Sequence, residues 1–103
     1  MLTAEQAHTL TKQARKDHRQ LFNDYFENTL DKMVNNSITA ASTAGHSSTY
    51  VAIPHLSTIP LEDFALMFKE KIRQYNYFID EEYKTYGFSA TYNEYLYSFY
   101  VSW

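Results

Sequence analysis

The stretch FSATYNEYLYSFYVSW, residues 88–103, decides the fold. Its bulky side chains alternate with small or polar ones on both sides of a polar pair, Asn93-Glu94. Successive side chains of a β-strand point to opposite faces of a sheet, so the alternation predicts two strands joined by a tight turn near this pair. The residues expected on the shared, mostly aromatic face are Phe88, Ala90, Tyr92, Tyr95, Tyr97, Phe99, Val101 and Trp103.

A third short strand is predicted over residues 49–53, Thr-Tyr-Val-Ala-Ile. It is followed by Pro54, which cannot donate a hydrogen bond to a sheet ladder. Because the last strand carries most of the apolar side chains, we expect it at the centre of a three-stranded sheet with the other two strands beside it.

Ahead of the sheet, the spacing of Thr3 and Gln6 fits a capping box and predicts a helix from Ala4 to about Asn35 or Thr39. Two apolar stripes along it are rotated from each other by roughly a third of a turn. One straight helix cannot direct both stripes at one small core, so either it bends over residues 18–22 or its first half packs on something outside the domain. The first stripe is Ala7, Leu10, Ala14, Leu21 and Tyr25, and the second is Phe22, Phe26, Leu30 and Met33.

A second helix is predicted after a Ser- and Thr-rich loop over about residues 41–48. Ser57 or Thr58 ahead of Pro60 marks its start. Gly87 suits the left-handed conformation that ends a helix or leads into a strand. The apolar stripe that defines this helix is Leu61, Phe64, Ala65, Phe68, Ile72, Tyr75 and Ile79.

The predicted order is helix, strand, helix, strand, strand, which we interpret as one α+β domain over residues 1–103. It is a two-layer α-β-α-β-β arrangement with a long N-terminal helix and a three-stranded sheet. The chain has 103 residues, 45% of them hydrophobic and 20% charged, which fits one modest core. It contains neither a membrane-length apolar run nor a signal-peptide pattern, so we expect it in the cytoplasm.

The sequence contains no catalytic signature, and we predict that the protein is not an enzyme and uses no cofactor. The absence of Cys excludes disulfides and thiolate metal sites. His46 stands beside Ser47 and Ser48, but no acid completes a triad. His55, just after the first strand, is the histidine best placed to contact a ligand at a sheet end. The acidic edge of the first helix does not converge at helical spacing, so no metal site is predicted; it comprises Asp17, Asp24, Glu27 and Asp31.

A basic face of the first helix leaves two interpretations open. It is formed by Lys12, Arg15, Lys16 and Arg19, opposite the first apolar stripe. These side chains could hold the phosphate of a nucleotide or a similar anion. They could equally be the solvated polar face that every amphipathic helix has. The net charge of −3 gives no global attraction to nucleic acid or to an anionic membrane, so neither is expected as a partner.

Several apolar residues have no expected place in the core. Leu66 and Tyr77 are predicted to project from the second helix opposite its main stripe, and Leu96 and Tyr100 lie on the second face of the hairpin. Tyr gives a large contact area at low entropic cost, so these four residues are candidate partner-binding residues. Together with the rotated stripe of the first helix they predict a homo-oligomer.

Both ends of the chain resemble small uncharacterised bacteriophage proteins with a helix, strand, helix and C-terminal hairpin. The similar segments are MLTAEQAHTLT at residues 1–11 and YGFSATYN at residues 86–93, which leads to the closing VSW. The resemblance implies a small accessory protein that is expressed in a bacterial host. Such proteins bind and block host factors, including those of host defence, or sequester small signalling molecules in oligomers.

Two hypotheses follow for the function. The first is a non-enzymatic phage accessory protein that binds and blocks a host protein. The alternative is an oligomeric module that binds or sequesters a nucleotide or a similar anionic small molecule, with the basic face of the first helix as its anion site.

Overall fold

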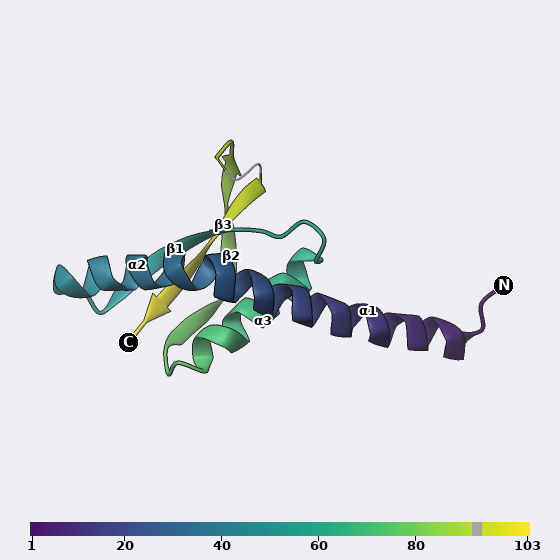
Figure 1. The fold of residues 1–103 in the computed structure, drawn as a ribbon. Helices are drawn as coiled ribbons and strands as arrows, with labels where there is room; N and C mark the ends of the chain where they lie inside the picture. The colour runs from purple at the N-terminus through teal and green to yellow at the C-terminus, as the bar shows by residue number, and fades with distance from the viewer. Residues whose placement is uncertain (92–93) are drawn as a thin grey trace.

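The computed structural model describes residues 1–91 and 94–103. Within them, a long N-terminal helix and a second helix accompany a three-stranded sheet, as predicted for an α+β fold (Figure 1). The elements are α1 (Ala4–Tyr25), the π-helix η1 (Phe26–Leu30), α2 (Asp31–Thr43), β1 (Ser48–Pro54), α3 (Leu61–Arg73), β2 (Phe78–Ser89) and β3 (Glu94–Ser102).

The sheet is antiparallel, and its strand order is β1-β3-β2, so the last strand lies at the centre as expected. Val51 of β1 pairs with Phe99 of β3, and Ile79 of β2 pairs with Val101 of β3. All four side chains are buried. Alternate residues along a strand share a face. The face of β3 that carries Phe99 and Val101 is therefore the face that packs on the core.

The prediction that strand structure begins at Phe88 is wrong, because β2 already starts at Phe78. Helix α3 ends at Arg73, and Asn76 then adopts a left-handed backbone conformation with φ of 67°. Asn tolerates this conformation better than most residues, so it can end a helix where no glycine is present. Tyr75 and Ile79, predicted as helical, therefore lie beyond the helix. Ile79 belongs to β2, and its side chain is buried in the core.

Gly87 lies inside β2 rather than at the end of a helix. Its φ of +131° coincides with a shift in the pairing of β2 with β3 between Thr85 and Gly87. Glycine reaches this conformation without a steric penalty, and such shifts are typical of β-bulges. The predicted turn falls partly outside the described residues, because Asn93 and the face residue Tyr92 are not among them.

The N-terminal helical segment is longer than predicted. It continues through η1 and α2 to Thr43, past the expected ends at Asn35 or Thr39, so the loop before β1 is shorter than residues 41–48. The predicted capping box is confirmed. The Gln6 backbone N–H donates to the Thr3 hydroxyl at 3.1 Å, and the Thr3 N–H donates to the Gln6 side-chain oxygen at 3.0 Å.

The irregularity of this long helix lies in η1, not over residues 18–22 as one alternative predicted. The Asp31 N–H donates to the carbonyl of Phe26, five residues back, which is the mark of a π-turn. Phe22, Phe26 and Leu30 of the predicted second stripe are buried, and Met33 is half-buried against the core. Val34 and Ile38, which were not assigned to that stripe, are buried too and continue its spacing of four residues. That spacing would drift by about 40° per step in a regular α-helix, and one π-turn accommodates an extra residue and cancels much of the drift, so these buried residues all face the core.

Both helical layers pack on one face of the sheet and form a single buried cluster with it. Phe68 of α3 packs on Phe99 of β3 with ring centroids 4.6 Å apart. Phe22 of α1 meets Phe64 of α3 edge to face at 5.4 Å. The remaining buried residues of the cluster are Phe26, Leu30, Val34, Ile38, Val51, Ile53, Ile59, Ala65, Ile72, Ile79 and Val101.

Residues 1–21 form an arm that projects beyond this body (Figure 1). Every residue of the arm is exposed except His18, which is half-buried, and Phe22 is the first buried residue of the chain. The molecule is accordingly elongated, with principal extents of 58 × 32 × 24 Å. In the part of the chain that the structure describes, none of the helices has the length and hydropathy needed to cross a membrane.

Candidate functional site

The first apolar stripe of α1 is uncovered along the arm. Leu10 is 58% exposed and Leu21 is 45% exposed, whereas Phe22 in the second stripe is 1% exposed. The sequence left two alternatives, a bend over residues 18–22 or a first half that packs on something outside the domain. The structure agrees with the second, because the first half of the helix is uncovered. Tyr25, assigned to this stripe, is the exception, because it is half-buried and packs against the core.

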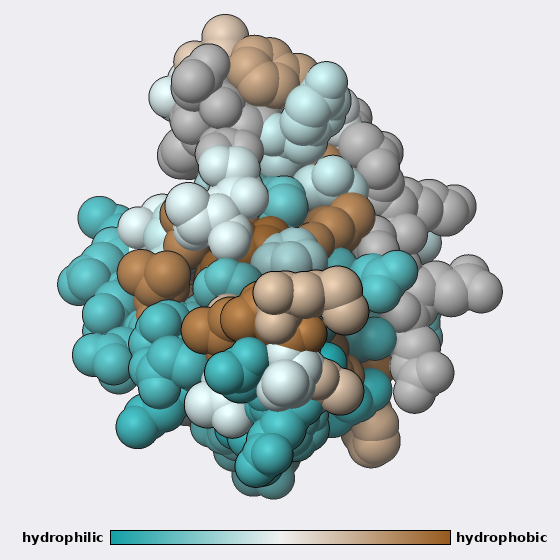
Figure 2. All heavy atoms as spheres, turned by 90° about the vertical axis from the view of Figure 1, so that its right-hand side faces the viewer, coloured by the Kyte–Doolittle hydropathy of each residue, from teal (hydrophilic) through white to brown (hydrophobic). Residues whose placement is uncertain are grey.

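Hydrophobic atoms are visible on the end of the molecule from which the arm projects. Figure 2 looks at this end and shows several groups of brown atoms near the middle of the view, with hydrophilic atoms between and below them. Single exposed apolar side chains are normal on a protein, but several on one surface are typical of an interaction surface. We call the exposed residues Ala7, Leu10, Ala14 and Leu21 the arm stripe.

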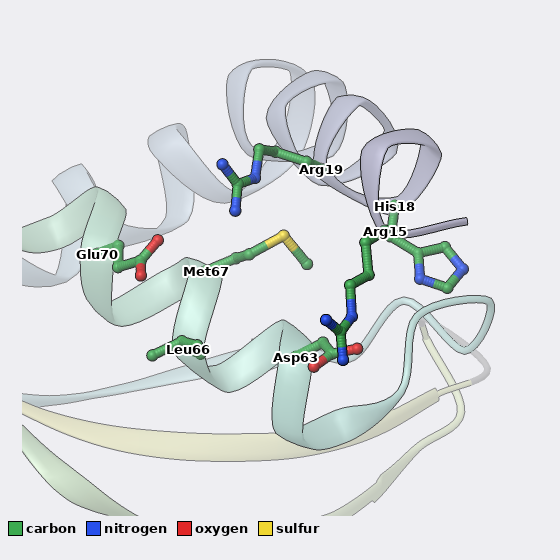
Figure 3. A pocket seen from close by; sticks show the side chains of 7 residues that line it. All are labelled: Arg15, His18, Arg19, Asp63, Leu66, Met67 and Glu70. Carbon is green, nitrogen blue, oxygen red and sulfur yellow. The ribbon is translucent and has the colours of Figure 1, made fainter. Parts of the chain in front are cut away.

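A groove of about 320 Å³ runs between the base of the arm and α3 (Figure 3). We call it the α1–α3 groove. One wall is basic and comes from α1, and the other comes from α3 and carries two carboxylates and two apolar side chains. Its lining residues are Arg15, His18 and Arg19 on α1, and Asp63, Leu66, Met67 and Glu70 on α3.

The groove divides the four basic residues that were predicted to form one anion site. Arg15 and Arg19 line it, whereas Lys12 and Lys16 lie on the exposed surface of the same helix outside it. In Figure 3 the Arg15 side chain extends toward Asp63. A phosphate in this groove would meet carboxylates as well as guanidinium groups, so the groove is not a site of uniform positive charge.

The four predicted partner-binding residues lie in separate places. Leu66 is 50% exposed and lines the α1–α3 groove. Tyr77 does not project from the second helix as predicted, because α3 ends at Arg73; it is half-buried, and its ring meets Trp103 edge to face at 6.1 Å. Tyr77 and Tyr100 line one hollow near the start of β2, and Leu96 is half-buried further along β3.

The face of the sheet opposite the helices forms a second uncovered surface. Tyr50 of β1 and Tyr100 of β3 are register partners, and their ring centroids are 5.1 Å apart. Tyr50 is 67% exposed, and Phe78 of β2 is 74% exposed. Sequence reasoning missed both residues as surface candidates. The alternation of residues 49–53 already places Tyr50 opposite Val51, but Phe78 was hidden by the overlong second helix.

The aromatic face of the hairpin is only partly in the core. Phe99 and Val101 are buried and Tyr97 packs against the core, as predicted. Phe88 and Tyr95, expected on the same buried face, are each more than half exposed and meet edge to face at 5.3 Å. They lie toward the turn end of the hairpin, and the buried cluster does not include them.

His55, for which a ligand contact was considered, packs within the domain. Its ring Nε2 lies 2.6 Å from the carbonyl oxygen of Ile59, and the ring packs edge to face on Phe64 and Tyr97 at 5.0 and 5.7 Å. These contacts hold the connection from β1 to α3 against the core. Across the described ranges, 1–91 and 94–103, there is no group of three or more His, Asp or Glu residues that could hold a metal ion.

Comparisons with protein-family models, with curated proteins and with solved structures give no match for this chain. The resemblance to small bacteriophage proteins therefore stays a prediction, and the interaction surfaces have to be interpreted from their own residues. Three surfaces remain for that purpose: the arm stripe, the α1–α3 groove and the open face of the sheet.

Proposed function

We propose that this chain is a non-enzymatic interaction protein that binds another protein through the arm stripe. The observation that carries the proposal is that Leu10 and Leu21 lie about half exposed on a helix whose other stripe is packed on the core. Burial of a leucine side chain contributes about 1.5–3 kcal/mol, so covering two half-exposed leucines contributes roughly half of that for each. The arm presents them on a helix that starts with a complete capping box, which lowers the cost of ordering the surface on binding.

The partner that we propose is a protein of a bacterial host, as the resemblance to bacteriophage proteins implies. In that case the chain acts as a phage accessory protein and blocks the surface that it covers. The same stripe supports self-association, because two copies can cover each other's leucines. A helix that docks by residues spaced three, four and seven apart is a common mode of protein recognition, and Ala7, Leu10, Ala14 and Leu21 have this spacing.

The test is an affinity pull-down from bacterial lysate with two matched variants. The double variant Leu10→Glu/Leu21→Glu places a charge on the stripe at both exposed leucines and should lose the partner. The control Thr9→Glu/Gln20→Glu adds the same charge one position earlier in each case, turned about 100° away from the stripe, and should retain it. All four positions are exposed, so neither variant should unfold the domain.

The expected result is one stoichiometric partner that the wild type and the control recover and the stripe variant does not. Recovery of the same partner by all three proteins would show that the stripe is not the binding surface. Absence of any stoichiometric partner from several host lysates, in a chain that also stays monomeric, would overturn the proposed function.

A further inference from the structure

The α1–α3 groove has oppositely charged walls and an apolar centre, an arrangement that the arm stripe does not explain. We propose that it binds a small zwitterion, an α-amino acid with an apolar side chain. The carboxylate of the ligand lies at Arg19, its ammonium group at Glu70, and its side chain over Met67. This site is independent of the protein partner proposed for the arm.

Arg19, Met67 and Glu70 occupy the middle of the groove. All three line the part next to Arg15 and Asp63, and all three also line its continuation toward Gln74. Figure 3 shows Met67 between the Arg19 and Glu70 side chains, with Arg19 reaching from α1 toward α3. A ligand that spans the two helices therefore meets a cation, an apolar side chain and an anion in one place.

The two walls are available for a ligand. In the described part of the chain no salt bridge joins them, and Arg19 and Glu70 are both exposed. A guanidinium group binds a carboxylate through charge-assisted hydrogen bonds, and an ammonium group does the same with the carboxylate of Glu70. The thioether of Met67 adapts to differently shaped apolar groups, and Leu66 adds a half-exposed apolar wall.

The charges favour a zwitterion over a simple anion. Phosphate at Arg19 would place its charge on the side of the groove where Glu70 lies, and like charges at short range are repulsive. An α-amino acid satisfies both walls and brings no net charge. The volume of about 320 Å³ is at the small end of ligand sites, which suits a molecule of this size better than a nucleotide. Arg19 and Glu70 are exposed, and exposed ion pairs contribute little, so we expect a Kd of about 1 mM.

The experiment is an NMR titration of the full chain, observing the Met67 methyl group and the backbone amides around the groove. L-leucine, L-methionine and L-phenylalanine should give saturable shifts there. N-acetyl-L-leucine lacks the ammonium charge and L-leucinamide lacks the carboxylate, so each should bind about tenfold more weakly than L-leucine or worse, because one charged hydrogen bond is lost. Glycine, which has no side chain, should bind more weakly than L-leucine as well.

Two variants assign the charged contacts, and their spectra report whether they fold. Arg19→Gln should abolish discrimination between L-leucine and L-leucinamide, and Glu70→Gln should abolish discrimination between L-leucine and N-acetyl-L-leucine. The control Lys16→Gln removes a positive charge from the same helix outside the groove and should bind L-leucine like the wild type.

Absence of saturable shifts at the groove with all three amino acids would overturn the proposal. Equal binding of L-leucine and both derivatives would do so too, and so would tighter binding of inorganic phosphate or ATP than of any amino acid. The stripe variant Leu10→Glu/Leu21→Glu should retain amino-acid binding, so this site and the arm interaction can fail separately.

Discussion

Tyr25 marks the point where the arm ends and the core begins. Its hydroxyl donates to the carbonyl oxygen of Pro54 at 3.0 Å, which connects α1 to the end of β1, and its ring lies 6.4 Å from that of Phe64. Sequence periodicity assigned it to the exposed stripe, because its angular position matches Leu21. A single hydrogen bond to a strand end, 29 residues away, is not visible in such a pattern.

Tyr25→Phe should lower the free energy of unfolding by about 1 kcal/mol, the typical net contribution of one hydrogen bond. The aromatic packing is retained, so the loss reports the hydroxyl alone. Urea unfolding measures it. Tyr75→Phe removes a hydroxyl from a side chain that is 57% exposed and should leave the midpoint unchanged. Equal losses in both variants would contradict the role given to the bond at Pro54.

At the scale of elements, the π-turn η1 keeps the second stripe on the core. Deletion of the exposed Asn28 should convert the turn into regular α-helix and leave Phe22, Leu30 and Ile38 on one face, because a π-turn corresponds to one inserted residue. We expect the free energy of unfolding to change by less than about 1 kcal/mol, within the range of neutral surface changes. Urea unfolding and helical circular dichroism check this.

The matched control is deletion of Asn35, which is also exposed but lies in regular α-helix. It turns everything after it by about 100°, so Ile38 leaves the core and about 1.5–3 kcal/mol of burial is lost. If the deletion of Asn28 destabilised the domain as much as the deletion of Asn35, the π-turn would not be the phase correction that we describe.

The elements that could be predicted are those with a clear pattern in the sequence. The alternation around Phe99 specified the central strand, and the capping box at Thr3 specified the start of α1. The segment from Tyr75 to Gly87 was misassigned because Tyr75 and Ile79 continue the helical spacing of α3, while the left-handed Asn76 that ends the helix leaves no periodic signal. For the same reason a hydrophobic pattern cannot distinguish a strand that begins at Phe78 from another helical turn.

The candidate surfaces were predictable to different degrees. Helical phase predicted that the stripe of Leu10 and Leu21 could not share one straight helix and one core with the second stripe, but the structure was needed to show that the stripe is exposed rather than turned inward by a bend. The α1–α3 groove could not be predicted, since it depends on how α3 lies against the arm. Only that packing places Glu70 opposite Arg19, whereas sequence reasoning grouped Arg19 with the lysines of its own helix.

For the whole molecule, the arm sets both shape and charge. It carries Lys12, Arg15, Lys16 and Arg19, out of nine basic residues in the chain, but only Glu5 and Asp17 out of twelve acidic ones. The arm is therefore positive while the chain as a whole has a charge of −3. Two arms that pair along their stripes bring like charges together, although their leucines attract.

Light scattering should therefore show a dimer or larger species whose fraction at fixed protein concentration rises with salt. Between about 0.05 M and 0.5 M salt the repulsion between arms is progressively screened, while the apolar contact is not weakened. The variant Leu10→Glu/Leu21→Glu should scatter as a monomer at every salt concentration. A strictly monomeric wild type at both ends of this range would remove self-association from the proposal.

The continuity of the long helix has a consequence for how the arm becomes ordered. Most of the stability of a helix in a protein comes from tertiary packing, because the first turn is costly to nucleate. Here the turns around Phe22 are fixed by tertiary packing, and the helix needs only to propagate outward from them toward the cap at Thr3. Any change that loosens the interior will thus fray the distant leucines, so the ability to recognise a partner reports on the integrity of the fold.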